Sequence, residues 1–223
     1  EFAPDGRADV TLGIDVGSTS TDLVLIDARC RIVDALYLRT GGDAERAVRK
    51  GLAELGRRAG PRVRVVAAAT TGSGRERMGK LVGADLVRDE ITAQAAAAAE
   101  TNPSADTVFE IGGQDSKFIS LKSGQVVDFQ MNKVCAAGTG SFVEEQAARM
   151  GIPIAEFGRM ALESAAPLDL GERCTVFVET AITSAVAAGA SKRDVAAGLC
   201  LSVVRNYLRR VVGTKHVGNH VVL

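Results

Sequence analysis

Short apolar runs separated by polar turns organise the first part of the chain. Residues 10–16 and 23–26 have the composition of buried strands, and a polar stretch at residues 17–21 joins them. Residues 31–39 predict a third strand, so we expect the chain to open as a β-meander. A helical spacing of apolar positions follows, and it predicts a helix from its N-cap, Asp43, to residue 58.

The next segments alternate in the same way. Residues 63–69 predict a strand, and the polar turn at residues 70–74 enters a short basic helix. An alanine-rich helix is expected at residues 89–100. Pro103 then interrupts the pattern, which is typical of a boundary between two lobes.

The second half of the chain repeats the order of elements found at its start. A strand is predicted at residues 107–111, a polar turn at 112–116 and a second strand at 118–121. A hairpin turn at residues 123–124 leads into a third strand at 126–130. A strand, a polar turn and two more strands therefore occur twice.

This duplication indicates an α/β protein with the actin-like (ribonuclease H-like) fold of two-lobed ATPases, with the nucleotide in the cleft. We expect an N-terminal lobe at residues 1–102 and a C-terminal lobe at 103–223. The chain begins without methionine and ends inside a β-rich run at residues 220–223. We therefore expect it to be a C-terminally truncated piece of a longer protein.

Helices dominate the last third of the chain. Apolar spacing predicts them at residues 135–150, 153–163, 174–188 and 191–212. Cys135 would open the first of these helices, and Cys174 would open the third. A thiolate at a helix N-terminus is stabilised by the positive end of the helix dipole, an environment that also suits an anionic iron–sulfur cluster.

Charge, hydrophobicity and cysteine content indicate which partners and which cell compartment to expect. The chain has 223 residues, with 27 Lys and Arg balanced by 27 Asp and Glu, so no nucleic-acid partner is expected. No apolar run reaches the ~18 residues that a membrane span requires. Four cysteines are too few for a dense disulfide framework, which favours a reducing cytoplasm.

The first polar turn has the residues of a phosphate-binding loop. Asp15 ends a strand and is a candidate ligand for Mg²⁺, directly or through water. The glycine that follows permits close backbone approach, and successive amides with hydroxyls can bind phosphate oxygens. A hairpin that binds no ligand is the alternative. The candidate nucleotide-binding residues here are Gly17, Ser18, Thr19, Ser20 and Thr21.

The second polar turn matches the first by its place in the repeat. Gly112 and Gly113 expose backbone, and Asp115 is a second candidate for Mg²⁺ or water. Gln114 is a candidate for orienting the attacking water. The catalytic candidates are thus Asp15, Gln114 and Asp115, although an ordinary unliganded Gly-Gly turn remains the alternative.

Two further segments allow two interpretations each. Residues 70–75 form either a third loop that reaches the nucleotide or a plain strand-to-helix turn. Asp89 and Glu90 either cap the helix that follows or provide an acid to the cleft.

The cysteines also leave alternatives open. Cys135 and Cys174 are either ligands of an iron–sulfur cluster, zinc ligands in a shared four-cysteine site, or small buried side chains. Cys30 and Cys200 are expected to be structural or incidental. The only histidines, His216 and His220, lie near the C-terminus, which argues against histidine-dependent nucleophilic catalysis.

With these motifs, the chain resembles the ATP-dependent activators of 2-hydroxyacyl-CoA dehydratases, a family that includes the ATPase subunits of benzoyl-CoA reductase. The phosphate turns are shared with sugar kinases, heat-shock-protein-70 and actin, whereas the two cysteine segments are more specific. The resemblance rests on residues 12–22, 71–75, 89–92, 110–117, 132–140 and 174–179.

The resemblance implies a homodimer that shares one [4Fe–4S] cluster, with Cys135 and Cys174 of each chain as ligands. The small residues Gly138, Thr139 and Gly140 would leave room beside it. It also implies that ATP binding or hydrolysis moves the cysteine helices. One low-potential electron would then pass to a dehydratase or reductase partner, with reduced ferredoxin or flavodoxin as the donor.

The amino-acid sequence resembles the second ATPase module of tandem-domain activators. In such a protein the two half-sites would meet within one polypeptide. The family continues past residue 223 into a Gly-Gly turn that contacts adenosine, and this sequence does not include it. A small-molecule kinase of the same fold, without a cluster, is the first alternative function. A degenerate module that serves assembly alone is the second.

Overall fold

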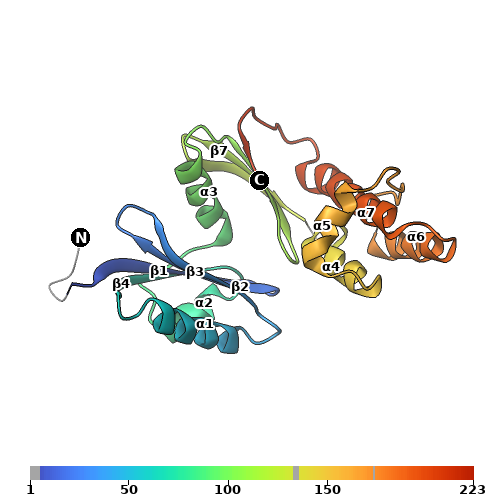
Figure 1. The fold of residues 1–223 in the computed structure, drawn as a ribbon. Helices are drawn as coiled ribbons and strands as arrows, with labels where there is room; N and C mark the ends of the chain where they lie inside the picture. Colours follow the sequence, from blue (N-terminus) through green and yellow to red (C-terminus); the bar gives the residue numbers. More distant parts are fainter. Residues whose placement is uncertain (1–5, 133–135, 173) are drawn as a thin grey trace. The chain divides into compact units, whose positions relative to one another are not determined.

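The computed structural model describes residues 6–132, 136–172 and 174–223 (Figure 1). The chain divides into two compact units, Glu1–Ala96 and Ala97–Leu223. Each unit contains one β-sheet, so the protein is a mixed α/β protein as the sequence predicts.

The sheet of unit 1 confirms the predicted β-meander. It contains β1 (Ala8–Val16), β2 (Ser20–Asp27), β3 (Ile32–Arg39), β4 (Val63–Thr71) and the short β5 (Leu86–Val87). The strand order is β3-β2-β1-β4-β5. β1 runs antiparallel to β2 and parallel to β4. Two residues of β5 are too few to give a periodic signal, and the sequence did not predict this strand.

Helices α1 (Ala44–Arg58) and α2 (Arg75–Val82) lie on one face of this sheet (Figure 1). Asp43 caps α1 as predicted, because its side chain accepts a hydrogen bond of 3.0 Å from the Arg46 amide. Alternate side chains of β1 are buried in the core below: Val10, Leu12, Ile14 and Val16. Because successive side chains of a strand point to opposite faces, the residues between these four lie on the other face of the sheet.

The sheet of unit 2 repeats the scheme of unit 1. It contains β6 (Thr107–Ile111), β7 (Ser116–Lys122), β8 (Gln125–Met131) and β9 (Val221–Val222), in the order β8-β7-β6-β9. β6 runs antiparallel to β7 and parallel to β9, as β1 does to β2 and β4. The duplication read from the sequence is therefore present in the strand pairing. Helix α3 (Glu90–Thr101) leads from the first unit into the second.

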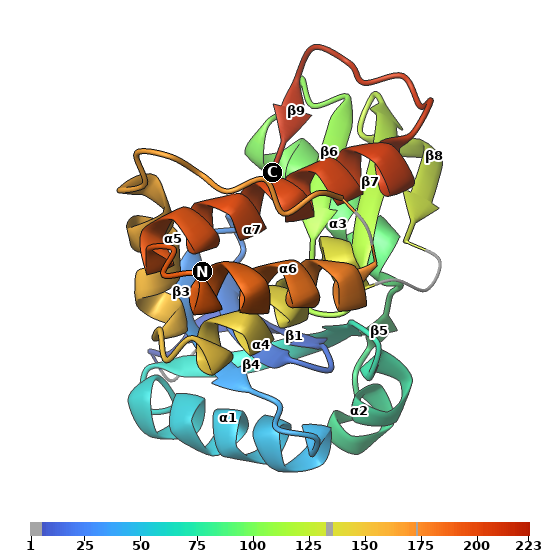
Figure 2. The same ribbon diagram turned by 90° about the vertical axis from the view of Figure 1, so that its right-hand side faces the viewer.

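Four helices complete unit 2 and pack around an apolar core. They are α4 (Gly140–Arg149), α5 (Ile154–Leu162), α6 (Thr175–Ala187) and α7 (Lys192–Tyr207). α7 continues into one π-helical turn, η2 (Leu208–Val212), and lies beside α6 (Figure 2). Among the described residues, no helix is long and apolar enough to cross a bilayer. The core includes Phe142, Phe157, Val178, Ile182, Val195 and Leu199.

One predicted helix begins later than expected. The sequence predicts a helix that starts at Cys135, but the described part is a single 3₁₀ turn, η1 (Ala136–Gly138), followed by an extended Thr139 at φ −130° and ψ 158°. α4 begins only at Gly140. Two glycines flank Thr139, and glycine lowers the helical tendency of a segment. The prediction that a helix opens at Cys135 is therefore wrong, while Cys135 itself lies outside the described residues.

Candidate functional site

Hydrogen bonds within unit 1 hold the first polar turn in shape. The Gly17 amide donates to the Ser20 carbonyl at 2.8 Å, and the Thr40 hydroxyl donates to the Gly17 carbonyl at 2.8 Å. The Thr21 hydroxyl lies 2.9 Å from that of Thr40 in a buried contact. Thr21 thus supports the turn from beneath. At the tip of the turn lie the exposed Ser18 and the half-buried Thr19.

Asp15 lies in a row of polar residues across three strands of the same sheet. It is paired with Asp22 on β2 and with Thr71 on β4, so the three side chains share one face. Asp15 is exposed, whereas partial burial raises the pKa of Asp22, opposed by a hydrogen bond from the Ser20 hydroxyl at 3.2 Å. An exposed carboxylate at a strand end is a suitable ligand for Mg²⁺.

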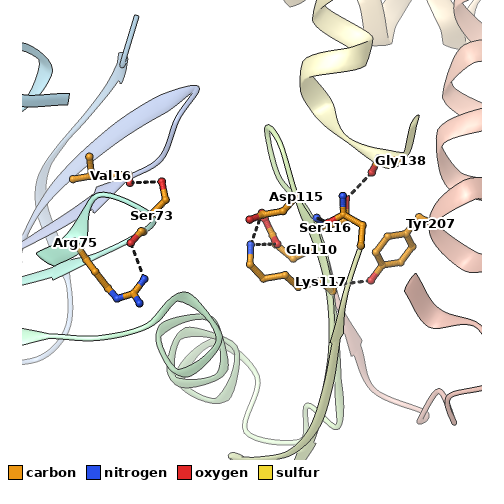
Figure 3. Close-up of polar contacts among 11 residues, drawn as sticks. Val16, Ser73, Arg75, Glu110, Asp115, Ser116, Lys117, Gly138 and Tyr207 are labelled. Carbon is orange, nitrogen blue, oxygen red and sulfur yellow. Dashed lines mark hydrogen bonds and ion pairs between the residues drawn. The ribbon is translucent and has the colours of Figure 1, made fainter. Parts of the chain in front are cut away.

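The loop after β4 packs against the end of β1. The Val16 carbonyl accepts hydrogen bonds from the Gly74 amide at 2.9 Å and the Ser73 hydroxyl at 3.3 Å (Figure 3). Gly72 has φ +86°, and a Cβ there would clash with Asp15 Oδ1. Within unit 1, this segment therefore lies directly beside Asp15 and the first polar turn.

The sequence left open the roles of two nearby charged residues, Arg75 and Asp89. A guanidinium nitrogen of Arg75 donates to the Gly72 carbonyl at 3.1 Å. Asp89 accepts hydrogen bonds from the amide and the hydroxyl of Thr92, at 2.9 Å and 2.8 Å, which lower the pKa of the Asp89 carboxyl. This geometry is that of an N-cap, so Asp89 caps α3.

The second polar turn lies in unit 2 between β6 and β7. The Gly112 amide donates to the Asp115 carbonyl at 2.9 Å and closes the turn. Lys117, whose side chain is only 4% exposed, donates from Nζ to Glu110 Oε2 at 2.8 Å and to Asp115 Oδ1 at 2.7 Å (Figure 3). A nearly buried ammonium therefore holds one of the predicted catalytic carboxylates beside the exposed Gln114.

Sequence reasoning missed Lys117. The predicted strand begins at residue 118, whereas Lys117 lies inside β7 (Ser116–Lys122) and is buried there, where an ammonium requires an anionic partner. Which carboxylates would reach it could not be read from the sequence, since Glu110 lies on the neighbouring strand.

The start of α4 is bonded directly to the second turn. The Gly140 and Ser141 amides donate to the Gly112 and Gly113 carbonyls, each at 2.8 Å. The first amides of a helix have no acceptor within the helix, and here the turn supplies two. The close approach also explains Gly140, where a Cβ would lie 3.3 Å from the Gly112 carbonyl oxygen.

The other two predicted small residues of this segment are buried nearby. The Gly138 carbonyl accepts a hydrogen bond of 2.6 Å from the Ser116 hydroxyl (Figure 3). Thr139 is fully buried, with its hydroxyl 3.3 Å from that of Ser141. The structure thus brings Gly138, Thr139 and Gly140 to the second polar turn.

Cys174 is an exposed cysteine at the N-terminus of α6. It is the N-cap residue, and its carbonyl accepts the first helical hydrogen bonds, from Phe177 at 3.0 Å and Val178 at 3.2 Å. Its sulfur lies 3.9 Å from the Thr175 hydroxyl. Val176 and Phe177 beside it are 63% and 60% exposed, so the thiol lies in an apolar surface. The prediction that a helix opens at Cys174 is confirmed.

The remaining cysteines are placed differently. Cys200 is half-buried in α7, and burial raises the pKa of its thiol, which disfavours the thiolate that a metal requires. Cys30 is exposed in the turn between β2 and β3. Among the described residues, which exclude Cys135, no three His, Cys, Asp or Glu side chains form a group that could hold a metal ion.

Ion pairs join residues 169–172 to the end of α7. Arg205 contacts Asp169 at 2.9 Å, and Arg209 contacts Glu172 at 2.5 Å. These residues line a groove between this segment and the end of α7.

Two sheets with the same strand scheme, each with a glycine-containing polar turn after its first strand, define the actin-like α/β ATPase fold. The solved structure of the activator of 2-hydroxyisocaproyl-CoA dehydratase from Clostridium difficile, with bound ADPNP, matches with a TM-score of 0.87 and 28% identity. The match covers 95% of this chain and 78% of that one. The chain belongs to the BadF/BadG/BcrA/BcrD ATPase family, whose model matches residues 12–223.

Two curated relatives are similar in sequence over most of the chain. The (R)-2-hydroxyglutaryl-CoA dehydratase activating ATPase of Acidaminococcus fermentans is 32% identical, and the match covers 91% of this chain and 76% of the relative. The activator of lactoyl-CoA dehydratase of Anaerotignum propionicum is 34% identical, over 86% of this chain and 74% of the relative.

The Lys117 ion pairs lead to a prediction about stability. Lys117→Met should lower the free energy of unfolding by about 3 kcal/mol, because it leaves the partly buried Glu110 without its cation. Urea denaturation measures this loss. Lys122→Met, at the exposed end of the same strand, is the control and should change stability by less than about 0.5 kcal/mol. Equal stability of the two variants would contradict the assignment.

Proposed function

We propose that this chain is an ATPase module that activates an acyl-CoA dehydratase or reductase by delivering one low-potential electron. The electron would come from a [4Fe–4S] cluster shared by two copies of the chain or by two tandem modules. The family and the names of the relatives, which are activators of dehydratases, support the activating role. One observation carries the cluster: Cys174 is exposed at the N-terminus of a 13-residue helix.

The two polar turns are the proposed nucleotide-binding elements. The amides and hydroxyls of Ser18 and Thr19 and the amides of Gly113 and Gln114 would bind phosphate oxygens, while the Gly17 and Gly112 amides close their own turns. Asp15, exposed and held beside Gly72, suits Mg²⁺, directly or through water. Gln114, which is exposed at the tip of its turn, would orient the water that attacks the γ-phosphate.

Asp115 would act together with Lys117 in this proposal. Since Asp115 Oδ1 accepts a hydrogen bond from Lys117 Nζ, the lysine fixes the carboxylate at the end of the turn. Asp115 would then contact the hydrated Mg²⁺ or the attacking water from a fixed position. The ADPNP-bound structure of the relative supports nucleotide binding by this fold.

The two cysteines of each chain would suit a cluster whose ligands come from two chains. Cys135 and Cys174 from each of two chains would provide four thiolates, the number that a [4Fe–4S] cluster requires. When bound, the cluster supplies one-electron redox chemistry at low potential. The N-terminus of α6, the positive end of the helix dipole, would favour an anionic cluster, and the exposed Val176 and Phe177 would be covered by the second chain. Reduced ferredoxin or flavodoxin is the proposed electron donor.

The nucleotide proposal predicts the effect of removing Asp15. Asp15→Ala should lower the rate of ATP hydrolysis at least tenfold, a loss of about 1.4 kcal/mol or more in transition-state stabilisation. Phosphate release measures the rate. Asp9→Ala removes a carboxylate from the other end of the same strand and should leave the rate unchanged. Full activity of the Asp15 variant would contradict the proposed role of Asp15, whereas a wild-type chain that hydrolyses no ATP would favour the degenerate module that serves assembly.

The cluster proposal predicts an iron content that depends on Cys174. Anaerobically prepared protein should contain about four irons and about four acid-labile sulfides per two chains. Cys174→Ser should lose both, whereas Cys200→Ser should keep them, because Cys200 is half-buried within α7. Iron-free wild-type protein that binds ATP normally would contradict the cluster proposal and favour a small-molecule kinase of the same fold.

A further inference from the structure

The segment that follows β4, residues 70–75, has a role that the sequence left open, and it lies against the end of β1. β1 and β4 run parallel, so their C-terminal ends meet at the same edge of the unit 1 sheet. The Val16 carbonyl accepts hydrogen bonds from this segment, and Gly72 leaves no room for a Cβ beside Asp15 Oδ1. The segment is therefore held beside a carboxylate of the proposed nucleotide site.

Arg75 ends this segment with a half-buried guanidinium (Figure 3). Its side chain is 31% exposed, and one of its nitrogens donates to the Gly72 carbonyl at 3.1 Å. Its ion pair with Glu76 spans 3.9 Å, and the Glu76 side chain is 73% exposed. A pair that is so long and so exposed contributes little to balancing the charge of a half-buried cation.

Other arginines of unit 1 are paired more closely, although their side chains are more exposed than that of Arg75. Six of them contact a carboxylate at 2.5–3.1 Å: Arg31, Arg49, Arg57, Arg58, Arg64 and Arg77. A guanidinium that is partly removed from water without a close carboxylate is suited to an added anion, and its planar fork of donors matches the oxygens of a phosphate. Arg75 therefore differs from these arginines in a way that points to an anionic ligand.

The position of Arg75 in unit 1 determines which phosphate it would meet. The first polar turn joins β1 to β2, whereas Arg75 follows β4, which lies on the other side of β1. Asp15, near the end of β1, lies between the two. A phosphate chain that is bound at the turn and crosses Asp15 would therefore bring its terminal group to Arg75, and not its inner phosphates.

We propose that Arg75 is a catalytic residue whose guanidinium contacts the γ-phosphate of the bound nucleotide. In ATP hydrolysis the oxygen of water forms a bond to the γ-phosphorus, and the bond to the bridging oxygen breaks with its electron pair leaving on ADP. The hydrogens of the water remain with the released phosphate. Charge on the transferred group is spread over its oxygens in the transition state, which a cation placed beside them stabilises. This inference rests on the proposed nucleotide role of the first polar turn.

The test measures the Kd for ADPNP and for ADP, each with Mg²⁺, together with kcat for ATP hydrolysis. Arg75→Gln should raise the Kd for ADPNP about tenfold or more, the effect of losing one hydrogen bond between charged groups. The Kd for ADP should stay within about threefold, well below the loss of one such bond, because ADP has no γ-phosphate. kcat should fall about a hundredfold, as on removal of one donor to a transition-state oxygen. A purely structural role of Arg75 would weaken both nucleotides alike.

Arg77→Gln is the matched control, because it removes the same charge from the same helix. Arg77 pairs with Glu45 at 3.1 Å and is 77% exposed. This variant should bind both nucleotides and hydrolyse ATP as the wild type does. Arg75→Lys keeps the charge but not the planar fork, so it should still weaken ADPNP more than ADP. It decides the question by the same ratio of Kd values if Arg75→Gln does not fold.

Two results would overturn the inference. In the first, the wild type hydrolyses ATP, but the ratio of the two Kd values or kcat is the same in Arg75→Gln as in Arg77→Gln. The proposed ATPase function would then survive, and only the role of Arg75 would fail. In the second, the wild type binds neither nucleotide, and the proposed function fails together with the inference.

Discussion

The amides at the start of α4 need acceptors outside the helix, and the carbonyls of Gly112 and Gly113 provide them. This pairing determines where α4 begins and which way the two carbonyls of the turn point. The opposite ends of those peptide groups, the Gly113 and Gln114 amides, are the ones that the proposed function assigns to phosphate. One set of backbone bonds thus connects the start of a helix with a candidate nucleotide turn.

The same strand scheme built twice explains why polar turns occur in equivalent places. In each unit the first strand pairs antiparallel with the second and parallel with a later one. The turn after the first strand is therefore held at a fixed position by a sheet with a buried core. The two units differ in what supports the turn: buried threonine hydroxyls in the first, and the nearly buried ammonium of Lys117 in the second.

The sequence predicted the strands other than β5, most helices and the segments that carry chemistry, because these depend on local periodicity and capping. Asp43 and Asp89, for example, cap helices as their positions suggest. The glycines around Thr139 weaken the helix locally, but the acceptors that fix the start of α4 at Gly140, the Gly112 and Gly113 carbonyls, could not be read from the sequence. The partners of Lys117 were missed for a related reason, since pairing between strands decides which carboxylate reaches a buried cation. The roles of the individual site residues remain predictions.

In the proposed function, ATP controls the transfer of an electron from the cluster to the partner enzyme. This transfer can be followed directly in the cluster-loaded, reduced protein. The measurement is the loss of the paramagnetic signal of the reduced cluster after rapid mixing with an oxidised 2-hydroxyacyl-CoA dehydratase. The account predicts rapid loss of the signal with Mg²⁺ and ATP, and little loss with Mg²⁺ and ADP. Equal rates with the two nucleotides, or a protein that shows no such signal after reduction, would contradict it.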